Sequence, residues 1–165
     1  MRALQILEVK PFMGKLLIQS VFDDFLLSEL TMNTFNRFQI SGKLNLDFYS
    51  TQELETLGAR TYSKWSEVKP IVYSLVRGSK TPLSFHISLI LGREQVESII
   101  RNSGIMMQAK EVSGLYFHIK YENTKLYIIT GIGLTQFTLD RTLEHVWDEQ
   151  VKSFLKKNEL AFLEE

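Results

Sequence analysis

The residues with the clearest chemical potential lie at alternating positions of predicted β-strands. His86 and His118 are each flanked by two large apolar residues. Successive side chains of a strand point to opposite faces, so burial of the apolar neighbours places both histidines on the outer face of a sheet. The same alternation puts further basic and aromatic side chains on that face: Arg37, Lys43, Tyr116, Lys120, Lys125 and Tyr127.

An open sheet face of this composition can stack planar rings and contact anions, as the faces of single-strand binding proteins do. We therefore predict a binding face formed by Arg37, His86, Tyr116, His118, Lys120 and Tyr127. Two other interpretations stay open. Tyrosine favours strands and cations keep an exposed sheet soluble, without any ligand. The face could also pack on a second copy in a homodimer.

A glycine-containing run supports an alternative function. Thr130-Gly131-Ile132-Gly133 precedes a helix predicted to begin near Asp140, and glycine-rich loops before helices can hold phosphates. The run lacks the lysine and the third glycine of the known phosphate-binding motifs, and a strand end or bulge explains it more simply. The alternative is a small enzyme acting on a phosphorylated or nucleotide-like substrate, with Thr130–Gly133, Asp140 and Arg141 at its site.

No metal and no other cofactor is expected. The chain has no cysteine, which excludes thiolate zinc sites and iron–sulfur clusters. The histidines His86, His118 and His145 show none of the close spacings typical of zinc sites. Ser84 and Ser88 neighbour His86, but no G-x-S-x-G motif surrounds them.

The composition is that of one globular domain spanning residues 1–165, with 44% apolar and 23% charged residues. Lysine plus arginine balance aspartate plus glutamate at 19 each, which makes nucleic acid a possible partner but not one favoured by net charge. A chain without net charge also has little electrostatic repulsion between its copies, so a homodimer is a possible assembly. No signal peptide and no apolar run of about 20 residues is present, so we expect a cytoplasmic protein without membrane contact.

The first half of the chain alternates between helical and extended patterns. Apolar residues recur at helical spacing over 9–17. Alternation then predicts a strand over 26–33 and a hairpin whose strands, 37–41 and 43–48, flank a turn at Ser41-Gly42.

Two further helices follow this predicted hairpin. Ser50 and Glu53 have the spacing of a capping box, which predicts a short helix ending at Gly58. A longer apolar helical face extends over 65–76, where Pro70 either kinks the helix or begins it afresh.

The second half has a crisper pattern. Strands are predicted over 84–91, 115–121 and 125–130, with a helix over 93–102 and an added edge at 136–138. A final helix follows an Asp140 cap and has an apolar inner face formed by Leu143, Val146, Trp147, Val151, Phe154 and Leu155. Glu144, Asp148 and Lys152 are interpreted as part of its solvated face.

Nearly all of these strands have a single apolar face, and they are joined by hairpins or by single helices. This pattern predicts an α+β fold, in which helices pack mainly on one face of an antiparallel sheet and the C-terminal helix lies on that sheet.

Four groups of residues resemble an uncharacterised family of short proteins from Gram-positive bacteria, a domain of unknown function. They are Thr34–Phe38, Leu75–Lys80 with Ser84-Phe85, Gly114–Tyr116 with Ile119–Tyr121, and Phe137–Arg141 with Trp147-Asp148. The resemblance covers nearly the whole chain. It implies a bacterial, cytoplasmic, single-domain protein and assigns no catalytic or binding residue.

Overall fold

A computed structural model describes residues 1–78 and 80–165. Its strands form one eight-stranded sheet in the order β3-β2-β5-β6-β7-β1-β8, and β4 pairs with β2 beside β3. Every strand pairing described is antiparallel. The strands are β1 (Ala3–Ile6), β2 (Leu26–Asn33), β3 (Arg37–Ser41), β4 (Ser63–Lys64), β5 (Ser84–Ile90), β6 (Val112–Glu122), β7 (Lys125–Leu134) and β8 (Phe162–Glu164).

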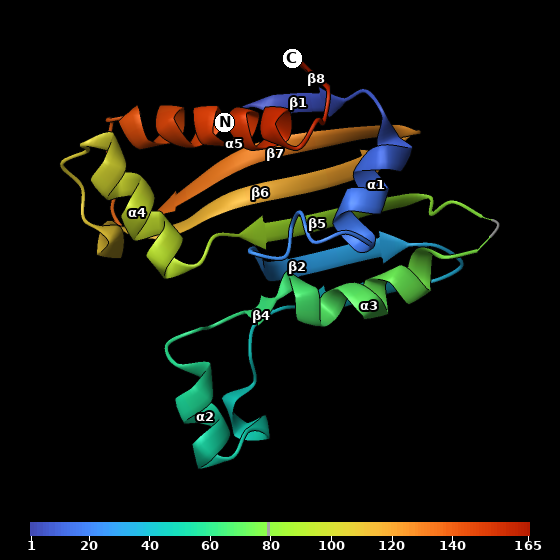
Figure 1. The fold of residues 1–165 in the computed structure, drawn as a ribbon, viewed down its shortest axis with the longest axis horizontal. Coiled ribbons are helices and arrows are strands. Elements are labelled where there is room, and N and C mark those ends of the chain that lie inside the picture. Colours follow the sequence, from blue (N-terminus) through green and yellow to red (C-terminus); the bar gives the residue numbers. More distant parts are fainter. Residues whose placement is uncertain (79) are drawn as a thin grey trace.

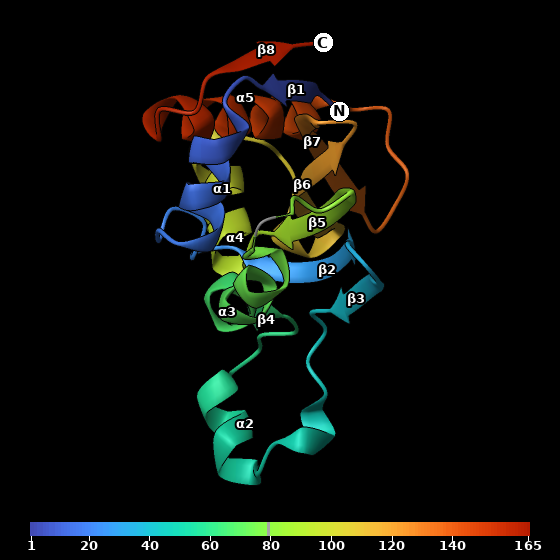
Figure 2. The same cartoon turned by 90° about the vertical axis from the view of Figure 1, so that its right-hand side faces the viewer.

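The helices gather on one side of this sheet (Figures 1 and 2). Within the described residues the α-helices are α1 (Val9–Leu17), α2 (Thr51–Leu57), α3 (Trp65–Val76), α4 (Arg93–Ser103) and α5 (Thr142–Lys157). Short 3-10 turns lie at Leu46–Phe48 and Ala109–Glu111. All the α-helices except α2 cover the inner face of the sheet, whereas α2 protrudes from the body (Figure 2). The predicted α+β fold is confirmed.

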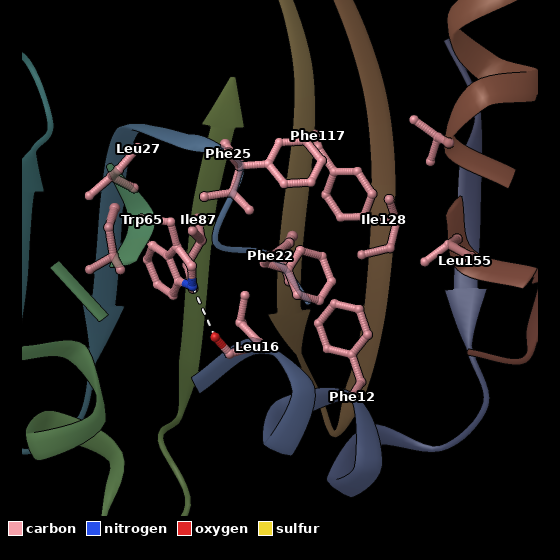
Figure 3. Packing of buried hydrophobic residues seen from close by; sticks show 14 of the residues in the cluster. Phe12, Leu16, Phe22, Phe25, Leu27, Trp65, Ile87, Phe117, Ile128 and Leu155 are labelled. Carbon is pink, nitrogen blue, oxygen red and sulfur yellow. Dashed lines mark hydrogen bonds between the residues drawn. The ribbon is translucent and has the colours of Figure 1, made fainter. Parts of the chain in front are cut away.

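The core lies between the helices and the inner sheet face (Figure 3). The Phe22 ring centroid lies 5.4 Å from that of Phe12, 5.6 Å from that of Phe117 and 5.3 Å from that of Phe154, in edge-on arrangements. Such edge-to-face packing adds stabilisation to the burial of the rings. The indole nitrogen of Trp65 donates to the carbonyl of Leu16 at 2.9 Å, so this buried polar atom is satisfied.

The predicted helices are confirmed. Ser50 and Glu53 form the predicted capping box of α2, and the helix ends at Gly58, whose φ of 66° favours glycine. Helix α3 begins at Trp65 and continues through Pro70, so the proline does not start a new helix.

The predicted strand over 43–48 is wrong. Residues 37–41 pair with β2 instead, in the register Met32↔Phe38, and the chain then leaves the sheet. Gly42 lies against β2 so closely that a Cβ atom there would be 1.8 Å from the carbonyl oxygen of Leu27. Lys43 forms only an isolated bridge with Tyr62. Leu46 and Phe48 beyond Gly42 therefore stay exposed, whereas Leu44 is half-buried and its backbone N–H donates to the Thr61 carbonyl at 2.9 Å.

Smaller differences arise at the ends and edges of elements. Residues 136–138 form no strand, and β1 and β8 were not predicted because each is only a few residues long. Helix α5 begins at Thr142, and the Asp140 carboxylate accepts from the Thr142 backbone N–H at 3.0 Å and from its hydroxyl at 2.6 Å. Asp140 thus supports the start of the helix from one residue outside the N-cap position.

The interpretation of Asp148 as a solvated residue is wrong. Its side chain is buried, and Thr130 Oγ1 donates to Asp148 Oδ1 at 2.5 Å. The second carboxylate oxygen lies 3.9 Å from Arg2 Nε, which the pairing of β1 with β7 brings to this place. Burial of a charged group requires such partners, and the sequence pattern of α5 alone does not show them.

The packing of α5 generates a stability prediction. Trp147 is 4% exposed on the inner side of α5, and its indole nitrogen donates to the Tyr116 carbonyl at 2.9 Å. Replacing a buried tryptophan by alanine leaves a cavity, so Trp147→Ala should lower the free energy of unfolding by about 3–5 kcal/mol. Urea denaturation followed by circular dichroism measures this change.

The matched control is Phe137→Ala, because Phe137 is 90% exposed. Its effect should stay within about 0.5 kcal/mol. A Trp147→Ala effect as small as that of the control would show that α5 does not pack through this face.

Candidate functional site

The predicted site residues lie mainly on the three central strands β5, β6 and β7. Two cross-strand rows carry them on the outer face. His86, Lys120 and Tyr127 face one another across the strands in the first row, and Ser88, His118 and Ile129 form the second. These six residues, together with Tyr116, are called the outer face below. The helices lie on the opposite side of the sheet (Figure 2).

A buried serine joins the two histidines. Ser88 Oγ lies 2.8 Å from His118 Nδ1 and 3.4 Å from His86 Nε2, and its side chain is 3% exposed. A hydroxyl can donate to one ring nitrogen while it accepts from another N–H. The two rings, with centroids 5.4 Å apart, are therefore held in one hydrogen-bonded group.

Tyr116 extends this group by stacking. Its ring is nearly parallel to that of His118, with an interplanar angle of 4° and centroids 5.4 Å apart. Glycines on the neighbouring backbone leave room for both rings. A Cβ atom on Gly114 would lie 2.8 Å from the Tyr116 ring, and one on Gly131 would lie 3.1 Å from His118 Nε2.

This geometry explains the glycine run. Residues 130–133 lie within β7 and form no loop, so the predicted strand interpretation holds and a phosphate-binding loop is absent there. Gly131 faces Tyr116 in the register, and Gly133 faces Gly114. The glycines make a flat strip beside the stacked rings.

Burial governs the electrostatics of the face. It lowers the pKa of His86, an effect that Glu29 opposes and Lys120 reinforces. Burial also lowers the pKa of His118, as does the neighbouring His86, with Glu29 acting in the opposite direction. Both imidazoles are consequently neutral at pH 7 and present hydrogen-bond donors and acceptors in place of charge.

Burial also favours the neutral form of the tyrosine in the stack. Burial raises the pKa of Tyr116, and the proximity of Tyr62 and Glu29 raises it further. The phenol therefore stays protonated and can donate a hydrogen bond. Lys120 is the cation of the central rows, and its ammonium lies 3.6 Å from the Glu122 carboxylate.

The structure does not bring every predicted residue together. Arg37 is exposed at the end of β3, opposite Asn33, which in turn faces Ser84. It thus lies two strands from β5 and one cross-strand row away from His86. Lys125 faces Glu122 beyond Lys120, and Lys43 lies outside the sheet. His145 lies on α5, where it lines a separate hollow with Arg2 and Glu144.

Sequence reasoning missed the roles of Ser88 and Glu29. Ser88 lies two residues from His86, and alternation places both side chains on the same face. Its contact with His118 depends on the register between β5 and β6, which no local pattern reveals. Glu29 faces Ser88 across β2 and β5 after a register shift between Leu27 and Glu29. That bulge changes which β2 residue meets the histidines.

The chemistry that the site can perform follows from these contacts. Among the residues that the structure describes, no three histidine, cysteine, aspartate or glutamate side chains are placed to hold a metal ion. Ser88 is too buried to serve as a nucleophile for an external substrate. The arrangement is suited to stacking and hydrogen bonding.

Residues 15–163 match the model of a family of unknown function, DUF5721. The chain belongs to this family. Every residue of the outer face of this DUF5721 protein lies inside the matched segment, whereas β1 precedes it. The resemblance to an uncharacterised family is thereby confirmed, although Ser79, part of one quoted motif, lies outside the described residues. Curated proteins and solved structures give no match to the chain. The described helices include none with the length and apolar character needed to cross a membrane.

The lowered histidine pKa values predict how stability depends on pH. The pKa of a histidine in the unfolded chain is about 6.5, and that of His118 in the folded chain is lower. As the pH falls, the unfolded chain therefore binds a proton first, and protonation favours unfolding. The stabilisation is complete above about pH 6.5 and is lost as the pH falls through the folded pKa. Wild type should therefore lose more unfolding free energy between pH 7 and pH 5 than His118→Gln, whose amide keeps a partner for Ser88.

Urea denaturation of both proteins across this pH range measures the difference. Carboxylates titrate in both proteins, so only the difference between them reports on His118. An equal or larger loss in His118→Gln would show that His118 is as easily protonated in the folded chain as in the unfolded one.

Proposed function

We propose that this protein is a non-catalytic binding module whose outer face takes a planar base that carries a phosphate, as in single-stranded nucleic acid or a nucleotide. The observation that carries the proposal is the nearly parallel Tyr116–His118 stack, which lies beside a glycine strip on an uncovered sheet face. Bases stack on such aromatic platforms with little regard to sequence.

The polar groups around the stack fit the same ligand. Neutral imidazoles and a protonated tyrosine can hydrogen-bond to base edges, and Glu29 supplies an acceptor for an exocyclic amine. Lys120 lies one row away from the stack and offers a cation to the phosphate. The base of one nucleotide unit can thus stack on the Tyr116–His118 pair while its phosphate contacts Lys120 on the adjacent row.

The shape of the molecule supports an extended ligand. Five hollows in the described chain are lined by residues outside this face. An uncovered sheet face suits a strand that lies across it better than a substrate that must be enclosed. With a net charge of zero for the whole chain, the affinity should be modest and sensitive to salt.

The alternative function, a small enzyme for phosphorylated substrates, has less support. It placed the site at Thr130–Gly133, Asp140 and Arg141. Thr130 is instead buried on the inner side and bonded to Asp148, while Asp140 serves the start of α5. The family resemblance and the sequence are the basis for a bacterial, cytoplasmic setting, which we retain as part of the proposal.

The test is a titration with short oligothymidylate and with thymidine monophosphate at low salt, followed by nuclear magnetic resonance. Loss of a stacking ring costs about 1–3 kcal/mol, so Tyr116→Ala should weaken oligonucleotide binding by about 5- to 150-fold. Lys120→Ala should also weaken oligonucleotide binding. It should make the slope of the logarithm of the binding constant against the logarithm of the salt concentration shallower by about 0.7. Binding of the monophosphate alone would identify a nucleotide site in place of a strand site.

Tyr73→Ala and Lys10→Ala are matched controls, because both residues are exposed on helices of the opposite side. They should bind as wild type does. The proposal fails if wild type does not bind, or if the outer-face variants bind as tightly as the controls. Sedimentation velocity distinguishes ligand binding from homodimer formation. If wild type is a dimer and Tyr116→Ala is a monomer, the outer face serves self-association.

A further inference from the structure

We propose that a hollow between α4 and α5 binds a small uncharged ring compound, at a site separate from the outer face. The hollow has a volume of about 280 Å³ and lies on the inner side of the sheet. Figure 1 shows both helices on this side. The inference does not depend on the function proposed for the outer face.

The lining of the hollow is mostly apolar. Leu91, Ile99 and Phe154 form half-buried walls, and Phe25, Phe117 and Trp147 form a buried floor. Helix α4 packs on the core through Val96 and Ile100, which leaves Ile99 facing the opening. The helix is thus anchored beside the hollow and does not fill it.

The absence of charge from the lining defines the ligand. The polar side chains there are Gln95, Ser98 and Gln150, and none of the lining residues is ionisable. Gln95 Oε1 already accepts from the Gly92 N–H at 3.1 Å. A charged ligand would lose its hydration without gaining a counter-charge, whereas an uncharged one would not.

The rings in the lining favour an aromatic ligand. Phe25 and Phe154 are perpendicular, with centroids 5.6 Å apart, and Phe117 lies 5.9 Å from Phe154 at 78°. Rings so arranged present edges and faces to which a further ring can add. A dry cavity of about 150 Å³ holds benzene, so the larger hollow has space for one or two fused rings.

The chain contains a built-in reporter for this site. It has two tryptophans, and both indole N–H groups are hydrogen-bonded, Trp147 to the Tyr116 carbonyl and Trp65 to the Leu16 carbonyl. Trp147 lines the hollow, whereas Trp65 is fully buried elsewhere in the core. Their two indole resonances in a nitrogen-15 spectrum therefore separate binding at the site from a general effect on the fold.

The experiment adds toluene and indole to nitrogen-15-labelled protein. Both compounds should shift the Trp147 indole resonance in a saturable manner and leave that of Trp65 in place. Benzoate and benzylammonium, which add a charge to the same ring, should produce no saturable shift. Equal shifts from the charged compounds, or a Trp147 resonance that does not respond to toluene, would overturn the proposal.

A pair of variants on α4 completes the test. Ser98→Phe places a ring inside the hollow and should abolish the toluene shift, while Glu97→Phe adds the same ring at an exposed position of α4 and should preserve it. Thermal unfolding verifies that both variants fold. Undiminished toluene binding by a folded Ser98→Phe variant would place the ligand elsewhere and refute the assignment.

Discussion

The pairing of β5 with β6 is the interaction on which both sides of the sheet depend. Its register sets Leu89 opposite Phe117 and Ile87 opposite Ile119 on the inner side, where all four side chains are buried. The same register sets Ser88 opposite His118 on the outer side. A slip of one residue would turn the apolar set outward and break the histidine group at the same time. The burial of the core thus determines the geometry of the candidate site, although no outer-face side chain contributes to that core.

A second constraint is the buried hydrogen bond between Thr130 and Asp148, at the part of the sheet formed by β7 and β1. Thr130 and Asp148 join β7 to α5 through a buried hydrogen bond, and the Arg2 backbone N–H donates to Thr130 Oγ1 at 2.8 Å. A buried carboxylate is tolerated only when its oxygens have partners, so α5, β7 and the start of the chain must assemble together. This explains why Thr130, although it stands between outer-face positions in the sequence, belongs to the stability of the fold.

The sequence predicted what depends on local pattern and missed what depends on pairing. Alternation placed His86 and His118 on one face, and the Ser50–Glu53 spacing predicted a helix start, because both follow from neighbouring residues. The strand predicted at 43–48 failed because alternation cannot show that 37–41 pairs back onto β2 and that Gly42 packs against the Leu27 backbone. Similarly, the contact between Ser88 and His118 joins residues 30 positions apart. The partners of Asp148 are Thr130, 18 positions away, and Arg2, near the start of the sequence.

Tyr116 is the point at which the two sides of the sheet meet. Its ring stacks on His118 outside, while its carbonyl accepts from the Trp147 indole inside. Tyr116 would couple the two sites only if a ligand at one site displaced Tyr116 from its contact at the other. The main chain of β6 is held on both sides by β5 and β7, so Tyr116 has no free edge toward which to move. We infer that a ligand bound beside Trp147 would displace side chains on the helical side and would leave the stacked rings on the outer face in position.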